Sequence, residues 1–501
     1  ENEEMRRLHG EFPVIFMSFA GAKSGYSAEA DGEANLDCIE SMKTAVKKII
    51  VRTYKEFSGI MKSDLFDDDD REYYSSIKKD MPDEAVATSI SILCTFLEKY
   101  YGKKVIILLD EYDTPMQEAW IYGYWDKAVA FFRSFFVNTF KNNESMERGL
   151  ITGITRISKE SVFSELNHLK VVTTTSDEYA LSFGFTEEEV FAALEHAGLG
   201  SEKETVKKWY DGFDFGKYTD IYNPWSIISF INDGGKYKAY WANTSSNSLV
   251  NSLIQRGNKA VKQTVEDLLA GKSFRVRIDE QIVFNQLEGN EDAVWSLLLA
   301  TGYLKVMDTE SFAGDRENEP YYTLALTNRE VRMMFKNMVR GWFSGDRVQT
   351  VYNDFIQAML DDNVRMMNAF MNQVALRTFS SFDSGNKPSE EAEPERFYHG
   401  FVLGMVVNMA DTYEVRSNRE SGFGRYDVML EPRDKDGKAF IFEFKVLDPY
   451  EDEKTLADTL AAALRQIEEK KYETELIARG FAPERIRKYG FAFQGKQCLI
   501  G

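Results

Sequence analysis

The chain has 501 residues and a formal net charge of −20, and 43% of its residues are apolar and 14% aromatic. This composition excludes a disordered chain, and the sequence contains no apolar run of about 18 residues that could span a bilayer. The negative charge argues against broad electrostatic attachment to nucleic acid, which requires clustered lysine and arginine.

The first part of the chain alternates apolar strands with amphipathic helices. Helices are predicted over 36–60 and 81–101, with an acidic loop, SDLFDDDDRE, between them. Three apolar runs are predicted to be strands, and the second has the fully apolar pattern of a central parallel strand: FPVIFMSF, VIILL at 105–109, and GLITGITRI. The alternation predicts an α/β domain over residues 1–175.

A mainly helical pattern follows. Thr186 and Glu189 are spaced as in a capping box, which opens a helix. The aromatic segments WYDGFDFG and IYNPWSI could stack on nucleic-acid bases, but packing inside the protein is the favoured interpretation. We expect a helical lid region over 176–250 and a mixed helical middle region over 251–382, which contains the strand-like YYTLALTN.

The last domain is expected over residues 383–501. It opens with a polar segment, DSGNKPSEEAEPE, that has the composition of a linker. The pattern then predicts helix, strand, strand, helix and strand. Residues 395–501 carry 17 Lys or Arg against 19 Asp or Glu, so this segment is nearly neutral and could meet a phosphate backbone locally.

One strand of this domain, FIFEFKVL at 440–447, carries two charges in an apolar run. Glu443 and Lys445 are two residues apart, so they project from the same face of a strand. The preceding apolar segment contains Asp427, and RDKDGK between the two segments carries the Asp-Gly signal of a hairpin. The hairpin is predicted to bring Asp427 close to Glu443 and Lys445.

Two carboxylates and an ammonium group together suit metal-dependent phosphate chemistry. Asp427 and Glu443 could hold a hard divalent cation, Mg²⁺ or Mn²⁺, through oxygen. Lys445 could stabilise charge on the phosphate or orient the attacking water. Gln466, in the strong helical pattern TLADTLAAALRQIEEKKY, could point back toward the site. An isolated Glu-x-Lys pair is more commonly a surface ion pair, and that interpretation stays open.

The motif resembles the PD-(D/E)XK nuclease superfamily. The whole chain, moreover, is similar to a widespread family of bacterial and archaeal proteins with an AAA-ATPase-like N-terminal domain and a PD-(D/E)XK nuclease-like C-terminal domain. By this resemblance Asp427, Glu443 and Lys445 match the nuclease triad, and Glu395 and His399 are weaker candidates. The resemblance is carried by VIILLDEYDTP, LITGITRISKESVFSELNHL, FGFTEEEV, WYDGF, IYNPWSI, YWANTSSN, FYHGFVLG, SNRESGFGRYDVML and FEFKV.

The resemblance also implies a nucleotide site in the N-terminal domain. Asp110 and Glu111 end an apolar strand, where P-loop NTPases place the acids that hold Mg²⁺ and polarise water. Thr152 would sense phosphate, and Arg156 would reach toward the nucleotide. Acids also end many strands simply by solvating the sheet edge, which is the competing interpretation of the Asp-Glu pair.

This sequence departs from the family at the phosphate loop. No G-x-x-x-x-G-K-[ST] occurs in it, and GAKSGYS is the nearest glycine-rich stretch. In relatives the loop precedes the FPVIFMSF strand, so we expect this loop and the first strand to be missing here. Without the loop amides and lysine, ATP loses its main anchor, and poor ATP binding is predicted.

Together these patterns predict a cytoplasmic α/β protein: an AAA-like remnant, a helical middle, and a nuclease-like domain that hydrolyses DNA. The three cysteines, Cys38, Cys94 and Cys498, are far apart, which favours a reducing compartment. A homo-oligomer or a regulatory protein partner fits the architecture, and a membrane does not. The alternative is a non-catalytic NTPase-type switch or interaction module with a degenerate nuclease fold.

Overall fold

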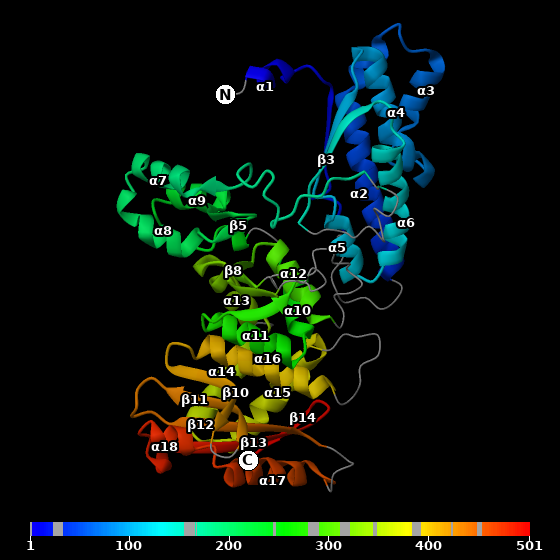
Figure 1. Ribbon diagram of the computed structural model, residues 1–501. Helices are drawn as coiled ribbons and strands as arrows, with labels where there is room; N and C mark the ends of the chain where they lie inside the picture. The colour runs from blue at the N-terminus through cyan, green and yellow to red at the C-terminus, as the bar shows by residue number, and fades with distance from the viewer. Residues whose placement is uncertain are drawn as a thin grey trace. The chain divides into compact units, whose positions relative to one another are not determined.

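The computed structural model describes residues 3–23, 34–154, 166, 168–243, 247–278, 290–310, 321–343, 348–382, 392–421, 424–447 and 453–501. These residues form two compact units (Figure 1). Unit 1 contains residues 1–176 and 277–302, and unit 2 contains residues 177–276 and 303–501. The finer division into four segments stays a prediction. None of the helices in the described ranges is long and apolar enough to cross a membrane.

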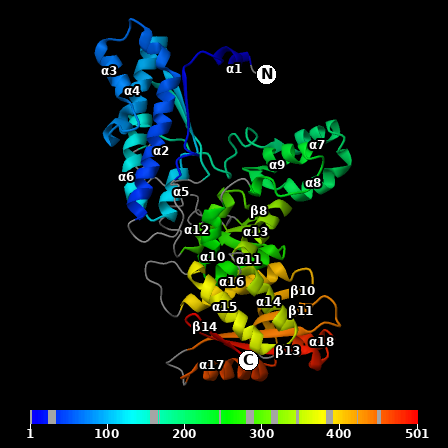
Figure 2. The same ribbon diagram turned by 180° about the vertical axis from the view of Figure 1, so that it is seen from behind.

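Unit 1 is built on a three-stranded parallel sheet in the order β1-β2-β3. Helices α2, α4 and α6 run beside this sheet in both views (Figures 1 and 2). The parallel sheet and its helices confirm the α/β prediction. The elements are α1 (Glu3–Leu8), β1 (Val14–Ser18), α2 (Ala34–Glu56), α3 (Asp68–Ser76), α4 (Asp83–Tyr101), β2 (Val105–Asp110), α5 (Thr114–Ile121), α6 (Trp125–Phe136), β3 (Met146–Ile151) and α12 (Glu291–Ala300).

The predicted acidic loop contains a helix instead. Asp67 is the N-cap of α3, and its side chain accepts a hydrogen bond of 2.8 Å from the Asp70 N–H. The Asp70 carboxylate in turn accepts a hydrogen bond from the Asp67 backbone N–H, which completes a capping box. Acidic side chains are stabilising in the first turn, where they meet the free N–H groups and the positive end of the helix dipole. The run of aspartates therefore starts a helix rather than solvating a loop.

Unit 2 begins with a small antiparallel sheet and the aromatic segments. The elements are β4 (Phe185–Thr186), α7 (Glu187–His196), α8 (Lys203–Tyr210), β5 (Phe213–Phe215), β6 (Tyr218–Tyr222) and α9 (Pro224–Asn232). The capping box of Thr186 and Glu189 opens α7 as predicted. Tyr210 and Tyr222 are buried in one apolar cluster with residues of α7 and α9. These two tyrosines therefore serve packing, as the favoured interpretation expects, whereas Trp225 of IYNPWSI is 57% exposed.

A buried carboxylate connects the elements in the middle of unit 2. Its elements are α10 (Ser248–Arg256), α11 (Lys259–Leu269), β7 (Phe274–Arg277), β8 (Leu304–Glu310), β9 (Tyr321–Leu326) and α13 (Arg329–Gly341), with sheet order β7-β9-β8. Glu330 on α13 is fully buried, and it accepts hydrogen bonds from Ser226 Oγ at 2.8 Å and Trp241 N at 2.7 Å. It therefore ties α13 to segments about a hundred residues earlier.

The C-terminal part of unit 2 is a five-stranded mixed sheet in the order β10-β11-β12-β13-β14. Only β12 and β13 are parallel neighbours. The sequence predicted three of these strands and missed β10 and β14. The elements are α14 (Val348–Leu360), α15 (Val364–Phe382), α16 (Ala392–Asn408), β10 (Tyr413–Ser421), β11 (Gly424–Pro432), β12 (Ala439–Val446), α17 (Leu456–Lys470), α18 (Thr474–Ala478), β13 (Ile486–Gln494) and β14 (Gln497–Ile500).

Helices cover both faces of this sheet. Helices α17 and α18 lie on one face and α14 to α16 on the other, in both views (Figures 1 and 2). On the α17 face, Met429 and Ile441 pack against Ile467 in a buried cluster. On the opposite face the Phe444 ring stacks on Tyr398 of α16, with centroids 5.0 Å apart. Because side chains alternate along a strand, Glu443 and Lys445 share the α17 face with Ile441.

Candidate functional site

The β11–β12 hairpin brings the predicted acidic residues together. Its register pairs Val428 with Phe442, so Asp427 and Glu443 are the next positions along the two antiparallel strands. Asp427 Oδ2 accepts a hydrogen bond of 2.9 Å from the Phe444 N–H. The predicted hairpin is confirmed, and it places the two carboxylates side by side on the α17 face.

Glu443 is the buried member of the pair. Its side chain is only 3% exposed, and its Oε1 accepts a hydrogen bond from Gln466 Nε2. Its Oε2 is buried and has no hydrogen-bond partner among the described residues. A buried carboxylate oxygen without a partner is costly, so it indicates a position that a cation or an unseen donor should satisfy.

The electrostatic environment of Glu443 points the same way. Burial and, next, the negative charge of Asp427 raise the pKa of Glu443 to about 8. The ammonium group of Lys445 and the hydrogen bonds from Asp427 and Gln466 oppose this shift of the pKa. Two carboxylates this close repel one another when both are ionised, and a bound divalent cation would relieve that repulsion.

Gln466 lies on α17, a helix with a capped N-terminus, and its side chain contacts a tyrosine. Thr455 caps α17 in a capping box with Asp458. Gln466 Nε2 also donates to Tyr472 Oη at 3.1 Å, and Tyr472 is buried just after the helix. The sequence reasoning missed Tyr472. The one feature of the sequence that points to Tyr472 is its position six residues after Gln466, just beyond the end of the helix.

The donor set fits Mg²⁺ or Mn²⁺ better than a zinc site. No group of three or more His, Cys, Asp or Glu side chains suited to a metal occurs in the described ranges. Mg²⁺ usually keeps several waters and binds one or two carboxylates together with phosphate oxygens. Asp427 and Glu443 supply those carboxylates, and the Glu443 Oε2 atom is a buried oxygen that still needs a partner.

The weaker candidates lie on α16. His399 is buried in this helix, next to Tyr398, whose ring stacks on Phe444. Phe444 points to the face opposite Glu443, because adjacent residues of a strand project to opposite sides. The side chain of Glu395 lies outside the described residues.

The N-terminal candidates lie at the carboxyl ends of β2 and β3 in unit 1. Thr152 Oγ1 donates a hydrogen bond of 2.7 Å to Asp110 Oδ1, so the structure brings these two together. Glu111 has a positive φ of 50° and accepts from Thr114 Oγ1 at 2.8 Å, which turns it toward the start of α5. Arg156 lies outside the described residues.

Comparisons with known proteins agree with the sequence resemblance. Residues 393–501 match the family model of the PD-(D/E)XK nuclease superfamily, and residues 1–163 match that of a predicted AAA-ATPase. The chain therefore carries a PD-(D/E)XK nuclease superfamily domain and an AAA-ATPase-like domain.

A curated relative is also similar over most of the chain. It is an uncharacterized protein in the vnfD 5′ region of Azotobacter chroococcum mcd 1. It is 23% identical over 405 residues, which cover 80% of this chain and 71% of the relative. No solved structure gives a significant match.

Proposed function

We propose that the PD-(D/E)XK domain hydrolyses phosphodiester bonds in DNA with Mg²⁺ or Mn²⁺. The observation that carries the proposal is the buried Glu443 Oε2 atom, which has no partner in the described ranges and lies beside the Asp427 carboxylate. Asp427 and Glu443 would hold the cation. When bound, the cation supplies Lewis-acid chemistry at the phosphate and lowers the pKa of water.

The residues of the chain divide the remaining tasks. Lys445 lies two residues after Glu443 on the same strand face and would stabilise the negative charge that develops on the phosphate. Gln466 donates to Glu443 Oε1 and so orients that carboxylate. Asp427 is oriented by the Phe444 N–H. A fixed carboxylate pair costs less to organise when substrate and metal arrive.

The proposed role of the N-terminal domain is regulatory. The Asp110–Thr152 hydrogen bond at the ends of two parallel strands is the arrangement expected of an NTPase-derived site. We propose that this domain descends from an ATPase that controlled the nuclease. The sequence contains no G-x-x-x-x-G-K-[ST], so we expect this chain to bind ATP poorly.

A cleavage assay tests the nuclease proposal. The purified chain is incubated with single- and double-stranded DNA and Mg²⁺ or Mn²⁺, beside Asp427→Ala and Lys445→Ala. We expect cleavage that EDTA abolishes, loss to background in Asp427→Ala, and a loss of about 100-fold or more in Lys445→Ala.

The same assay separates the two candidate functions. A degenerate nuclease fold that acts only as a switch or interaction module would show no metal-dependent cleavage with either cation. Cleavage that persists in Asp427→Ala would come from a contaminant or from another site, and it would contradict the assignment. Binding of Mn²⁺ without cleavage would favour the non-catalytic alternative.

A further inference from the structure

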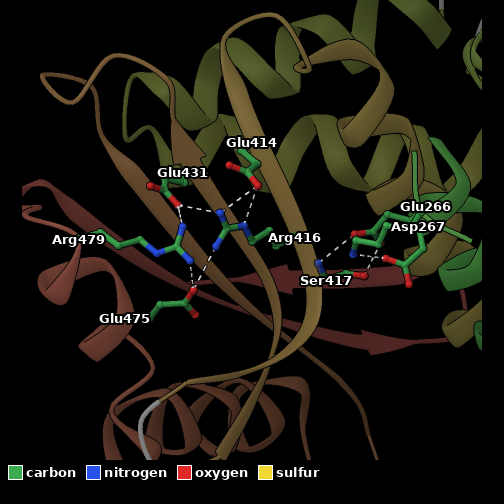
Figure 3. Close-up of polar contacts among 9 residues, drawn as sticks. Glu266, Asp267, Glu414, Arg416, Ser417, Glu431, Glu475 and Arg479 are labelled. Carbon is green, nitrogen blue, oxygen red and sulfur yellow. Dashed lines mark hydrogen bonds and ion pairs between the residues drawn. The ribbon is translucent and has the colours of Figure 1, made fainter. Parts of the chain in front are cut away.

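Helix α11 holds an edge strand of the C-terminal sheet through one carboxylate. Glu266 is largely buried on α11, and its Oε1 accepts a hydrogen bond of 3.1 Å from the Ser417 N–H on β10. Its Oε2 accepts from the hydroxyl of the same serine (Figure 3). The two residues are 151 positions apart in the sequence, so this contact joins the helical middle region to the C-terminal sheet.

The contact satisfies a donor that the sheet itself leaves open. Strand β10 is at the edge of the five-stranded sheet and pairs with β11 alone. Since the Ser417 N–H donates to Glu266, it points away from β11 and would otherwise lack an acceptor. Ser417 pairs with Val428, the residue directly after Asp427. Glu266 therefore fixes β10 one position from a proposed metal ligand.

A second set of contacts holds the β10–β11 strand pair on the face of the sheet that α18 covers. Arg416, next to Ser417, forms ion pairs with Glu431 at 3.5 Å and with Glu475 of α18 at 3.1 Å (Figure 3). Arg479 reaches the same two carboxylates at 2.7 and 2.6 Å. Ion pairs thus anchor the β10–β11 strand pair to α18, and Glu266 anchors it to α11.

The connection between α11 and β10 is bordered by open space. A cavity of about 840 Å³ lies here, lined by Lys272 and Lys336 from the middle region and by Arg433 and Arg479 from the C-terminal part. The pocket borders the contact, whereas the apolar residues of α11, such as Val265, are buried.

We propose that Glu266 is a positioning residue for the Asp427–Glu443 metal site. By holding Ser417, it fixes β10 and, through the β10–β11 ladder, keeps Asp427 opposite Glu443. The metal affinity of this site is then coupled to the position of α11, which gives the helical middle region a route to control the nuclease domain. The effect of Glu266 on metal affinity rests on the proposed function, whereas its effect on the position of Asp427 does not.

The test uses the full chain with two substitutions on the same helix. Glu266→Ala removes both acceptors of Ser417, and Val265→Ala makes a cavity at the neighbouring buried residue without touching a hydrogen bond. Glu266→Gln keeps one acceptor for the Ser417 N–H, and its amide can donate to the serine hydroxyl. It should therefore rescue most of the effect.

The first readout is hydrogen exchange, measured by mass spectrometry without metal, of the β12 peptide that contains Phe444. Its N–H is protected by Asp427 Oδ2, so it reports where Asp427 lies. We expect Glu266→Ala to speed this exchange by about tenfold or more, and Val265→Ala to leave it unchanged. The second readout is Mn²⁺ affinity by calorimetry, which should fall about 10-fold or more in Glu266→Ala alone.

The outcomes separate the two proposals. Unchanged exchange at β12 in Glu266→Ala, or an equal effect of Val265→Ala, would overturn the positioning role. If the wild-type chain binds no Mn²⁺ and cleaves no DNA, the proposed function fails. The exchange data then still decide whether Glu266 fixes the position of Asp427 opposite Glu443. Faster exchange with unchanged Mn²⁺ affinity would overturn the coupling to metal.

Discussion

Gln466 on α17 donates a hydrogen bond to Glu443 on β12, and it makes this contact with only one of the two carboxylate oxygens. The other oxygen, Oε2, stays buried and without a partner in the described part of the chain. An amide that occupies one oxygen fixes the carboxylate and leaves the second oxygen to bind a cation. Gln466 is therefore expected to tune the site rather than to react.

Replacement of Gln466 tests this division of roles. Gln466→Ala should weaken Mn²⁺ binding by about 10- to 100-fold and slow cleavage to a similar degree, because the carboxylate loses its orienting donor. Calorimetric titration with Mn²⁺ measures the affinity directly. Glu469→Ala, at an exposed position of the same helix, serves as the control and should bind Mn²⁺ like the wild type. If Gln466→Ala binds Mn²⁺ as tightly as the wild type, Gln466 has no role in the metal site.

Asp211 predicts a pH dependence of stability in unit 2. Burial raises its pKa from 3.8 to about 7, with a smaller contribution from the charge of Asp220. Because the folded form holds the proton more tightly, its stabilising effect is complete below pH 4 and is lost as the pH rises through 7. Asp211→Asn mimics the protonated carboxyl, so its stability relative to the wild type should rise between pH 4 and 8.

Thermal unfolding across this pH range measures the effect. The free-energy difference between Asp211→Asn and the wild type should change by up to about 1 kcal/mol per pH unit inside the window. Asp354→Asn is a matched control, since Asp354 is exposed on α14 in the same unit. A difference between Asp211→Asn and wild type that is constant from pH 4 to 8 would contradict the assignment.

Nucleotide binding gives a prediction for the N-terminal domain. Isothermal titration of the chain with Mg-ATP should show weak or no binding, because the sequence has no G-x-x-x-x-G-K-[ST] to surround the phosphates. Tight binding that disappears in Asp110→Ala would show instead that the Asp110–Thr152 pair belongs to a working nucleotide site.

Glu330 predicts a large effect on stability far from the proposed metal site. Burial raises the pKa of its carboxyl, and the hydrogen bonds from Ser226, Ala242 and Trp241 oppose this shift. Glu330→Ala leaves several buried donors without an acceptor, so it should destabilise unit 2 by roughly 2–4 kcal/mol. Urea unfolding followed by tryptophan fluorescence measures the loss. Glu204→Ala, at an exposed position of α8, should cost little.

Local patterns in the sequence were sufficient for the hairpin. The alternation of side chains in FIFEFKVL and the Asp-Gly turn signal together predict that Asp427 and Glu443 share one face, and the strand register agrees. The capping box at Thr186 was also readable, because all its partners lie within one helical turn.

Strand β10 was missed because an edge strand does not need an apolar sequence. Tyr413, Val415 and Ser417 alternate with Glu414 and Arg416 along it, and the charged positions form ion pairs on the α18 face. The period-two pattern was present, but its polar residues concealed it.

The contacts made by Glu266 and Glu330 had no signal in the sequence. Each carboxylate meets its donors across about 90 to 150 residues, and only the folded chain brings them together. A buried glutamate on a helix looks like a surface residue until its partners are known.

The reach of Glu330 has a consequence for how the protein is made. Ser226 and Trp241 leave the ribosome 104 and 89 residues before the carboxylate that accepts their hydrogen bonds. At synthesis rates of about 5–20 residues per second, these donors wait roughly 4 to 21 seconds for their acceptor. During that interval the local cluster of α7 to α9 can form, but the connection of this segment to α13 has to wait until α13 has emerged.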